Sequence, residues 1–575
     1  MEKVSLIIKN TQVYNSYLKR FISADVSVRD GKFFFIDREH TSEVVSEEVL
    51  DAEGAYMLPG FIDIHMHIES SMMTPAAFGQ CVAGYGVTTI VSEPHEIANV
   101  KGIQGIEEMI REGEESPIDM YYGIPSSVPS TNVNLETTGG IIDFQSMKQL
   151  LEDRKIVCVG EIMNYRQVIK DENLEIRKFL NYLQQERSDF IIEGHCPSLV
   201  GLDLAKFLYL GIDGDHTEHT LEEVKQRIEN GMFLEIQDKM LKPEILNYII
   251  ENRLYEYCAF VTDDTMADVL LYEGQLNHVV EKAVKLGFPL EQAIYCATYT
   301  PARRMHLYDR GVIAPGKTAD FMLLNNPAHI KPQAVYKNGK EIYNCQKSRT
   351  TKPSSFPKDF YHSIQLPELT ENDFKMPVSR FRAGTAPKEV KVRVMEVQSD
   401  CTQTRETYMD MPVEDGYIEW KSSGCLLAMV IERYGKNGNI GYGFISGACM
   451  KNGTVATTYF HDHHNLFVAG NNEQDMLLAV KRIQKLQGGI LMVDNQKILS
   501  ELALPVCGIL SEEPLKEIGT RLCHIRKNLK NLGYNHLNPI MSLATLGLPV
   551  SPTLKLTDVG LVKVETGKIV PLILE

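Results

Sequence analysis

The feature that most constrains the fold of this chain is a pattern of short apolar runs that recurs between residues 58 and 310. Most of the runs end in a polar residue and lead into a longer stretch with helical periodicity. Strands that alternate with helices pair in parallel, and eight such units in about 250 residues are typical of a TIM barrel. A doubly wound open sheet is the alternative, but it would not bring the polar ends to one mouth. The eight runs span residues 62–67, 87–92, 120–124, 156–159, 190–192, 211–213, 232–236 and 258–261.

The ends of these runs carry residues that bind metals. His65 and His67 lie two residues apart, so on a strand both side chains project from the same face and can hold one ion. Taken singly, each polar residue has an ordinary structural role as an ion pair, a core histidine or a helix cap. Because catalytic residues of a TIM barrel gather at the carboxyl ends of its strands, the residues together predict a metal site. The other ends carry Glu161, His195, His216 and Asp263.

The chemistry that such a set supports is hydrolysis. Four histidines, a glutamate and an aspartate suit two divalent ions of borderline softness. Glu161 could bridge the ions, while Asp263 could bind one of them and act as the general base. A divalent ion can lower the pKa of bound water from about 16 to about 7, which makes hydroxide available at neutral pH. We therefore expect a metal-activated hydroxide to attack an electrophilic carbon.

Composition narrows the function classes further. The chain has 575 residues and a formal net charge of −17, which argues against binding to nucleic acid backbones. It lacks the run of about 18 apolar residues that a membrane helix needs. Its 11 cysteines form no Cys-x-x-Cys pair and predict reduced thiols in the cytoplasm. Homo-oligomers are common, but nothing in the sequence selects an interface.

The segments outside the barrel indicate three further parts. Residues 1–57 read as β-strands with an Asp30-Gly31 hairpin turn, and residues 311–345 return to β-like runs. We expect both segments to build one small β-sandwich that flanks the barrel of residues 58–310. Residues 346–388 are rich in Pro, Ser, Thr and Lys and read as a linker. Residues 389–575 mix strands with helices and predict a C-terminal α+β domain.

Several peptide motifs resemble the bacterial adenine deaminases, which belong to the amidohydrolase superfamily. The most specific is the stretch that continues the histidine pair, Ile-His-Met-His-Ile-Glu-Ser-Ser-Met-Met-Thr-Pro. A second is Glu-Pro-His-Glu-Ile-Ala-Asn-Val, where the family usually begins with Asp. The resemblance spans nearly the whole chain and includes residues 64–75, 93–100, 128–139, 314–320, 487–490, 548–550 and 554–558.

This resemblance implies hydrolytic deamination of adenine to hypoxanthine and ammonia at a two-metal centre. The family's ions are usually described as manganese or iron, and zinc is also compatible with the ligands. Carried over residue by residue, one ion would be held by His65 and His67, and the other by His195 and His216. Glu161 would bridge the two ions, and Asp263 would bind metal and serve as the general base.

Seven further residues lie in family motifs or near the expected mouth of the barrel. They could hold substrate, hold a further ion, or support the ligands, and the sequence does not choose among these roles. His461, His463 and His464 likewise fit either a solvated loop or a C-terminal loop that closes on substrate. The seven residues are Glu69, His95, Glu96, Glu136, Gln237, Asp462 and His464.

Three departures from the family pattern leave the substrate open. Thr217 stands where the family commonly has Glu, residues 237–240 read Gln-Asp-Lys-Met instead of Arg-Glu-Gly-Ser, and His463 replaces Ser. The alternative substrates are another aminopurine, or an amide or cyclic ureide. Relatives that hydrolyse those amides often bridge their metals with a carbamylated lysine, and Glu161 in that place favours a deaminase. A third hypothesis is a non-catalytic, metal-binding regulatory protein.

Overall fold

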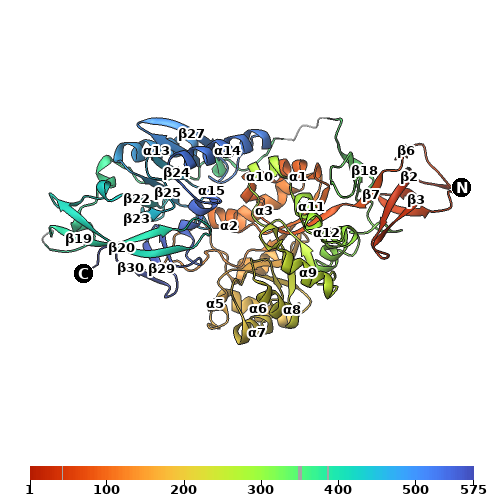
Figure 1. Cartoon of the computed structure of the whole chain (residues 1–575), viewed down its shortest axis with the longest axis horizontal. Helices are drawn as coiled ribbons and strands as arrows, with labels where there is room; N and C mark the ends of the chain where they lie inside the picture. The colour runs from red at the N-terminus through yellow and green to blue at the C-terminus, as the bar shows by residue number, and fades with distance from the viewer. Residues whose placement is uncertain (42, 348–352, 385–386, 575) are drawn as a thin grey trace. The chain divides into compact units, whose positions relative to one another are not determined.

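The computed structural model describes residues 1–41, 43–347, 353–384 and 387–574 (Figure 1). The chain divides into two compact units. The first unit holds residues 1–94, 109–126 and 143–354, and the second holds residues 95–108, 127–142 and 355–575. Of the predicted linker 346–388, residues 348–352 and 385–386 lie outside the described part of the chain. Described linker residues form the short 3-10 helices η3 (Lys358–Tyr361), η4 (Glu371–Phe374) and η5 (Val378–Arg380).

The first unit contains the predicted barrel. Its eight strands pair in chain order and in parallel, and a parallel bridge between Met66 and Asp263 nearly closes the sheet. The predicted fold class is therefore confirmed. The strands are β8 (Phe61–Met66), β9 (Val87–Ser92), β10 (Asp119–Ile124), β11 (Ile156–Ile162), β12 (Ile191–Gly194), β13 (Gly214–Asp215), β14 (Phe233–Ile236) and β15 (Cys258–Phe260).

The prediction for the sixth strand was wrong by three residues. The apolar run at residues 211–213 is not a strand; β13 begins only at Gly214, which pairs with Glu193. The reason lies at Gly211, whose φ of +91° turns the chain after helix α7 (Gly201–Tyr209). Only glycine adopts this conformation without strain, so the strand starts after the turn. His216 still follows the strand end directly.

Helices cover the outside of the barrel. The longest, α12 (Leu290–Arg304), packs against β8 and β15, the two strands that meet where the barrel closes. The strand residues Ile62, Ile64, Val91 and Ala259 build a buried core with Ala302 and Met305 beside them. The other helices are α1 (Pro75–Ala83), α4 (Phe144–Leu150), α5 (Tyr165–Val168), α6 (Glu175–Glu186), α8 (Leu221–Glu229), α9 (Pro243–Glu251), α10 (Ala267–Tyr272) and α11 (Leu276–Lys285).

Both flanks of the barrel contribute strands to one further sheet of the first unit. Its order is β18-β17-β16-β7-β2-β3-β4, and Figure 1 shows the red N-terminal strands beside the green β18. Asp30 and Gly31 both have positive φ and form the predicted hairpin turn between β3 and β4. The strands of this path are β2 (Leu6–Asn15), β3 (Arg20–Arg29), β4 (Lys32–Asp37), β7 (Tyr56–Pro59), β16 (Phe321–Leu324), β17 (Ala334–Lys337) and β18 (Lys340–Asn344), and the eighth strand, β6 (Val49–Asp51), pairs with β2.

This sheet leads straight into the first barrel strand. β7 ends at Pro59 and β8 begins at Phe61, with Gly60 as the single residue between them. A Cβ at Gly60 would lie 2.1 Å from the hydroxyl oxygen of Thr88, so only glycine allows β8 to pass this close. The sheet thereby fixes β8, which carries His65 and ends one residue before His67.

The second unit is an α+β structure, as predicted for the C-terminal region. A nine-stranded sheet has the order β21-β20-β19-β23-β22-β25-β24-β26-β27. Helix α13 (Glu473–Leu486) packs against β24, β25 and β26, and α14 (Leu515–Asn531) packs against β27. The strands are β19 (Glu389–Val397), β20 (Thr404–Glu414), β21 (Tyr417–Ile418), β22 (Leu426–Ile431), β23 (Ile440–Gly447), β24 (Thr454–Thr457), β25 (Leu466–Gly470), β26 (Gly489–Asp494) and β27 (Lys497–Ala503).

A smaller three-stranded sheet completes the second unit, with strands β28 (Leu554–Thr557), β29 (Gly560–Lys563) and β30 (Lys568–Val570). Helix α2 (His95–Lys101) also belongs to this unit, although it follows barrel strand β9 in the sequence. Across the described residues, the structure contains no helix with the length and apolar character needed to span a membrane.

Candidate metal centre

The six predicted ligands lie together at the carboxyl ends of the barrel strands. Glu161 stands between the histidines: its Oε2 is 2.7 Å from His195 Nδ1 and 3.1 Å from His216 Nε2. Its other oxygen, Oε1, is 3.7 Å from His67 Nε2. Asp263 Oδ1 lies 3.6 Å from His67 Nε2 and 4.0 Å from His65 Nε2. The two oxygens of Glu161 thus face two different sets of histidines.

The donor atoms fit divalent metal ions. Among the six predicted ligands, two groups of three have ligand atoms within 4.8 Å of one another: His65, His216 and Asp263 form one, and Glu161, His195 and His216 form the other. His65 Nε2 is buried and has no hydrogen-bond partner among the described residues. A buried polar atom normally has a partner, so an ion that accepts this lone pair explains its position. Nitrogen and carboxylate ligands of this kind suit manganese, iron or zinc.

The charges of the site also favour cations. Burial alone would raise the pKa of Glu161, but His195 and His216 lower it well below its usual range. Burial likewise opposes ionisation of Asp263, whose pKa is nevertheless lowered by His67 and His216. Both carboxylates are therefore ionised at neutral pH. The neighbouring Glu161 raises the pKa of His216 to about 8 against the effect of burial, so an ion that binds His216 must displace its proton.

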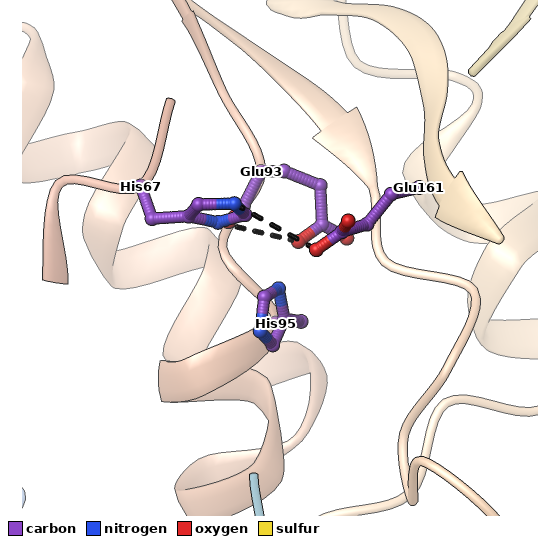
Figure 2. A group of neighbouring side chains, drawn as sticks. All are labelled: His67, Glu93, His95 and Glu161. Carbon is purple, nitrogen blue, oxygen red and sulfur yellow. Dashed lines mark hydrogen bonds and ion pairs between the residues drawn. The ribbon is translucent and has the colours of Figure 1, made fainter. Parts of the chain in front are cut away.

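The orientation of His67 is fixed by Glu93, which directly follows β9. Figure 2 shows the side chains of Glu93 and Glu161 facing the His67 ring, while His95 begins α2. His67 Nδ1 donates to the backbone carbonyl of Glu93 at 2.9 Å, and Glu93 Oε2 lies 3.8 Å from the same nitrogen. With Nδ1 protonated, Nε2 keeps its lone pair for an ion. The sequence reasoning noted Glu93 only as part of a motif.

A buried glutamate that the sequence reasoning missed lies beneath the histidines. Glu235 Oε2 is 3.9 Å from Nδ1 of His65 and 3.9 Å from Nδ1 of His216. Neither oxygen of Glu235 has a hydrogen-bond partner among the described residues, and burial followed by repulsion from Glu193 raises its pKa. Glu235 lies on β14, two residues before Gln237, which follows the strand, but nothing in the sequence marks it as more than one residue of an apolar strand.

The first two departures from the family pattern have structural partners. Gln237 Nε2 donates to Asp263 Oδ2 and to the backbone oxygen of His216, both at 2.9 Å. The backbone N–H and the hydroxyl of Thr217 donate to Asp215, at 3.1 Å and 2.9 Å. Gln237 and Thr217 therefore hold the carboxylates of Asp263 and Asp215 in place. Gln237 is thus a neighbour of the general base predicted from the sequence.

The remaining predicted residues fall in both units. Glu69 is buried in the 3-10 helix η1 (Glu69–Ser71) of the first unit. In the second unit, Glu96 contacts both His464 and His461, and His95 Nε2 lies 3.9 Å from Asp462 Oδ1.

Glu136 is also in the second unit, where it accepts hydrogen bonds from Ser130 and Thr131. His461, His463 and His464 are buried, which excludes the solvated loop, one of the two alternatives that the sequence left open.

Comparisons with known proteins agree with this geometry. The amidohydrolase family model matches residues 56–344, and the adenine deaminase C-terminal domain model matches residues 402–568. The chain is 45% identical to a Clostridium perfringens protein named adenine deaminase, over 99% of this chain and 100% of the relative. It is 44% identical to adenine deaminase 2 of Oenococcus oeni, over 100% of this chain and 99% of the relative. It is 45% identical to adenine deaminase 2 of Shouchella clausii, over 99% of this chain and 99% of the relative. The chain therefore belongs to the adenine deaminase family of amidohydrolases.

Proposed function

We propose that this protein hydrolyses adenine to hypoxanthine and ammonia, with two divalent metal ions bound at the barrel mouth. The observation that carries the proposal is the position of Glu161, whose oxygens face His67 on one side and His195 with His216 on the other. The full-length relatives named adenine deaminase support adenine as the substrate. Membership in the amidohydrolase family supports the use of divalent metal, and we assign manganese or iron.

The ligands divide into two sets. One ion would be held by His65 and His67, the other by His195 and His216, with Glu161 shared and Asp263 bound to one of them. The ions, when bound, supply a water nucleophile at neutral pH and polarise the substrate.

The proton transfers belong to Asp263. Its Oδ1 faces the histidines, while its Oδ2 is held by the amide of Gln237. The ionised carboxylate accepts a proton from the attacking water and delivers it to the amino group that leaves as ammonia. One water is consumed for each adenine, and the oxygen ends on the carbon that carried the amino group.

The family departures do not favour another substrate. The amide of Gln237 donates a hydrogen bond to Asp263, and the hydroxyl of Thr217 donates one to Asp215. Asp238 forms an ion pair with Lys282 at 2.7 Å. These contacts support a positioning role for the substituted residues. Glu161 in the bridging position, where amide-hydrolysing relatives often use a carbamylated lysine, also supports deamination.

We place the protein in the cytoplasm, with a small purine as its substrate. All eleven cysteines are free thiols, as expected in a reducing compartment.

A substrate panel tests the proposal. Protein loaded with manganese or iron is incubated with adenine, another aminopurine and a cyclic ureide, and both ultraviolet absorbance and ammonia are followed. We expect turnover with adenine at the highest kcat/KM. Turnover of an aminopurine or ureide without turnover of adenine would contradict the substrate and retain the hydrolytic chemistry.

A further inference from the structure

The second unit contains its own buried cluster of metal-ligand residues. His95 and Glu96 come from the first turn of α2, and His461 and Asp462 come from the segment between β24 and β25. All four belong to the second unit, and each is at most 5% exposed. None of them is among the six ligands assigned to the barrel.

The four donor atoms converge. His95 Nε2 is 3.5 Å from Glu96 Oε1 and 3.9 Å from Asp462 Oδ1. His461 Nδ1 is 3.5 Å from Asp462 Oδ1 and contacts Glu96 Oε1 directly. All four atoms lie within 4.8 Å of one another. Ligand atoms about 2.1 Å from a shared ion lie at most about 4.2 Å apart, so small movements would suffice to coordinate one ion.

The charge and burial of the cluster suit a dication. Two carboxylates in a buried position carry two negative charges, which are costly without compensation. A divalent ion would balance both charges while the two imidazoles remain neutral ligands. Asp462 Oδ2 is buried and has no hydrogen-bond partner among the described residues. Two imidazole nitrogens and two carboxylate oxygens suit manganese, iron or zinc.

Neighbouring side chains hold the cluster in this arrangement. The second oxygen of Glu96 contacts His464 Nε2, and His464 Nδ1 lies 3.2 Å from the backbone oxygen of Thr458. The ring of His461 packs edge-on against Tyr459, with centroids 4.9 Å apart. Outer contacts of this kind orient the ligands of known metal sites.

We propose that His95, Glu96, His461 and Asp462 bind a third divalent metal ion, in addition to the two assigned to the barrel. This ion would tie the start of α2 to the segment that precedes β25, and so would order the second unit. The competing arrangement is a cluster of hydrogen-bonded ion pairs in which protonated histidines balance Glu96 and Asp462 without metal.

Metal content tests the proposal on the full-length protein. Wild type and a Glu96→Gln/His461→Gln double variant are saturated with Mn²⁺, freed of excess ion and analysed by mass spectrometry. We expect the double variant to hold one ion fewer per chain than wild type. A matched control, His463→Gln, alters a buried histidine outside the four ligands and should keep the wild-type content. Equal content in wild type and a folded double variant would overturn the proposal.

This difference of one ion does not depend on the proposed function. If the barrel bound no metal, wild type would still hold one ion that the double variant lacks.

A second measurement avoids any loss of folding in the variant. Wild-type crystals grown with Mn²⁺ should give an anomalous scattering peak between the four donor atoms. Density without such a peak would overturn the proposal whether or not the barrel is occupied.

Discussion

Gln237 Nε2 donates a hydrogen bond to Asp263 Oδ2 at 2.9 Å, and the same amide nitrogen donates to the backbone oxygen of His216 at 2.9 Å. Asp263 Oδ1 is thereby left facing His65 and His67. The amide of Gln237, which directly follows β14, therefore fixes which oxygen of Asp263 would be available if this residue is the general base, as we propose. A residue at which this chain departs from its family pattern thus positions the proposed general base.

Gln237→Leu should slow the reaction by about 10- to 100-fold, because a hydrogen bond to a charged group contributes about 1.5–3 kcal/mol. Loss of this donor raises the pKa of Asp263, whose active form is the carboxylate. The acid limb of the kcat/KM profile should therefore move to higher pH. Gln237→Arg restores a donor and should return the limb toward its original position. An unchanged pH profile in Gln237→Leu would refute the positioning role.

Asp263→Asn should lower kcat by about 10²- to 10⁴-fold, the usual contribution of a positioned general base. The amide cannot accept the proton of the attacking water. Because the histidines and Glu161 remain, at least one metal ion should stay bound. Steady-state kinetics and metal analysis check both statements, with Asp203→Asn on α7 as control, since the side chain of Asp203 is 49% exposed. Near-normal turnover in Asp263→Asn would exclude the assigned proton transfer.

Glu235→Met should weaken metal binding by about 10- to 100-fold, as expected when the outer partner of a histidine ligand is lost. Glu235 Oε2 lies 3.9 Å from Nδ1 of both His65 and His216. The metal-free variant should nevertheless be more stable, by about 1–3 kcal/mol, because a buried carboxyl without hydrogen bonds is removed. Titration with a competing chelator and thermal unfolding separate these opposite effects. Equal metal affinity in wild type and Glu235→Met would show that Glu235 does not support metal binding.

Glu136→Gln should change how stability depends on pH. Burial raises the pKa of Glu136 from 4.5 to about 7. Between these two values the folded protein keeps a proton that the unfolded chain has released. The resulting contribution to the free energy of unfolding is complete below pH 4.5 and is lost as the pH rises through 7. This shift in pKa corresponds to about 3 kcal/mol of stability that depends on pH. Glutamine does not titrate, so the variant has no such dependence at this position.

Thermal unfolding at pH 5 and pH 8 measures this dependence. Between these two values wild type should lose more stability than Glu136→Gln. Parallel changes in the two proteins would show that Glu136 does not titrate in this range.

The barrel and the convergence of the six proposed ligands could be predicted because strand ends are local signals. His65 and His67 lie two residues apart and so face the same side, and Glu161, His195 and Asp263 each follow an apolar run. Two rules were sufficient to predict that these residues lie close together: side chains two residues apart on a strand share a face, and the carboxyl ends of parallel barrel strands meet at one mouth. The start of β13 was predicted three residues too early, because Gly211 forms a turn and the apolar Ile212 that follows it resembles the first residue of a strand.

Residues that depend on long-range packing could not be predicted in the same way. Glu235 stands inside an apolar strand, and its place beneath two histidines depends on the closure of the barrel. The grouping of His95 and Glu96 with His461 joins segments more than 360 residues apart. Sequence order gives no signal for that proximity, since loop closure over such a distance leaves no local pattern.

We propose that Glu161 would be a ligand of two ions at a centre that deaminates adenine. The most direct measurement is the amount of ammonia released per adenine consumed by the metal-loaded protein, in wild type and in Glu161→Gln. We predict one ammonia for each adenine in wild type and no release above background in Glu161→Gln. Wild type that consumes no adenine, or Glu161→Gln that releases ammonia at the wild-type rate, would contradict the account.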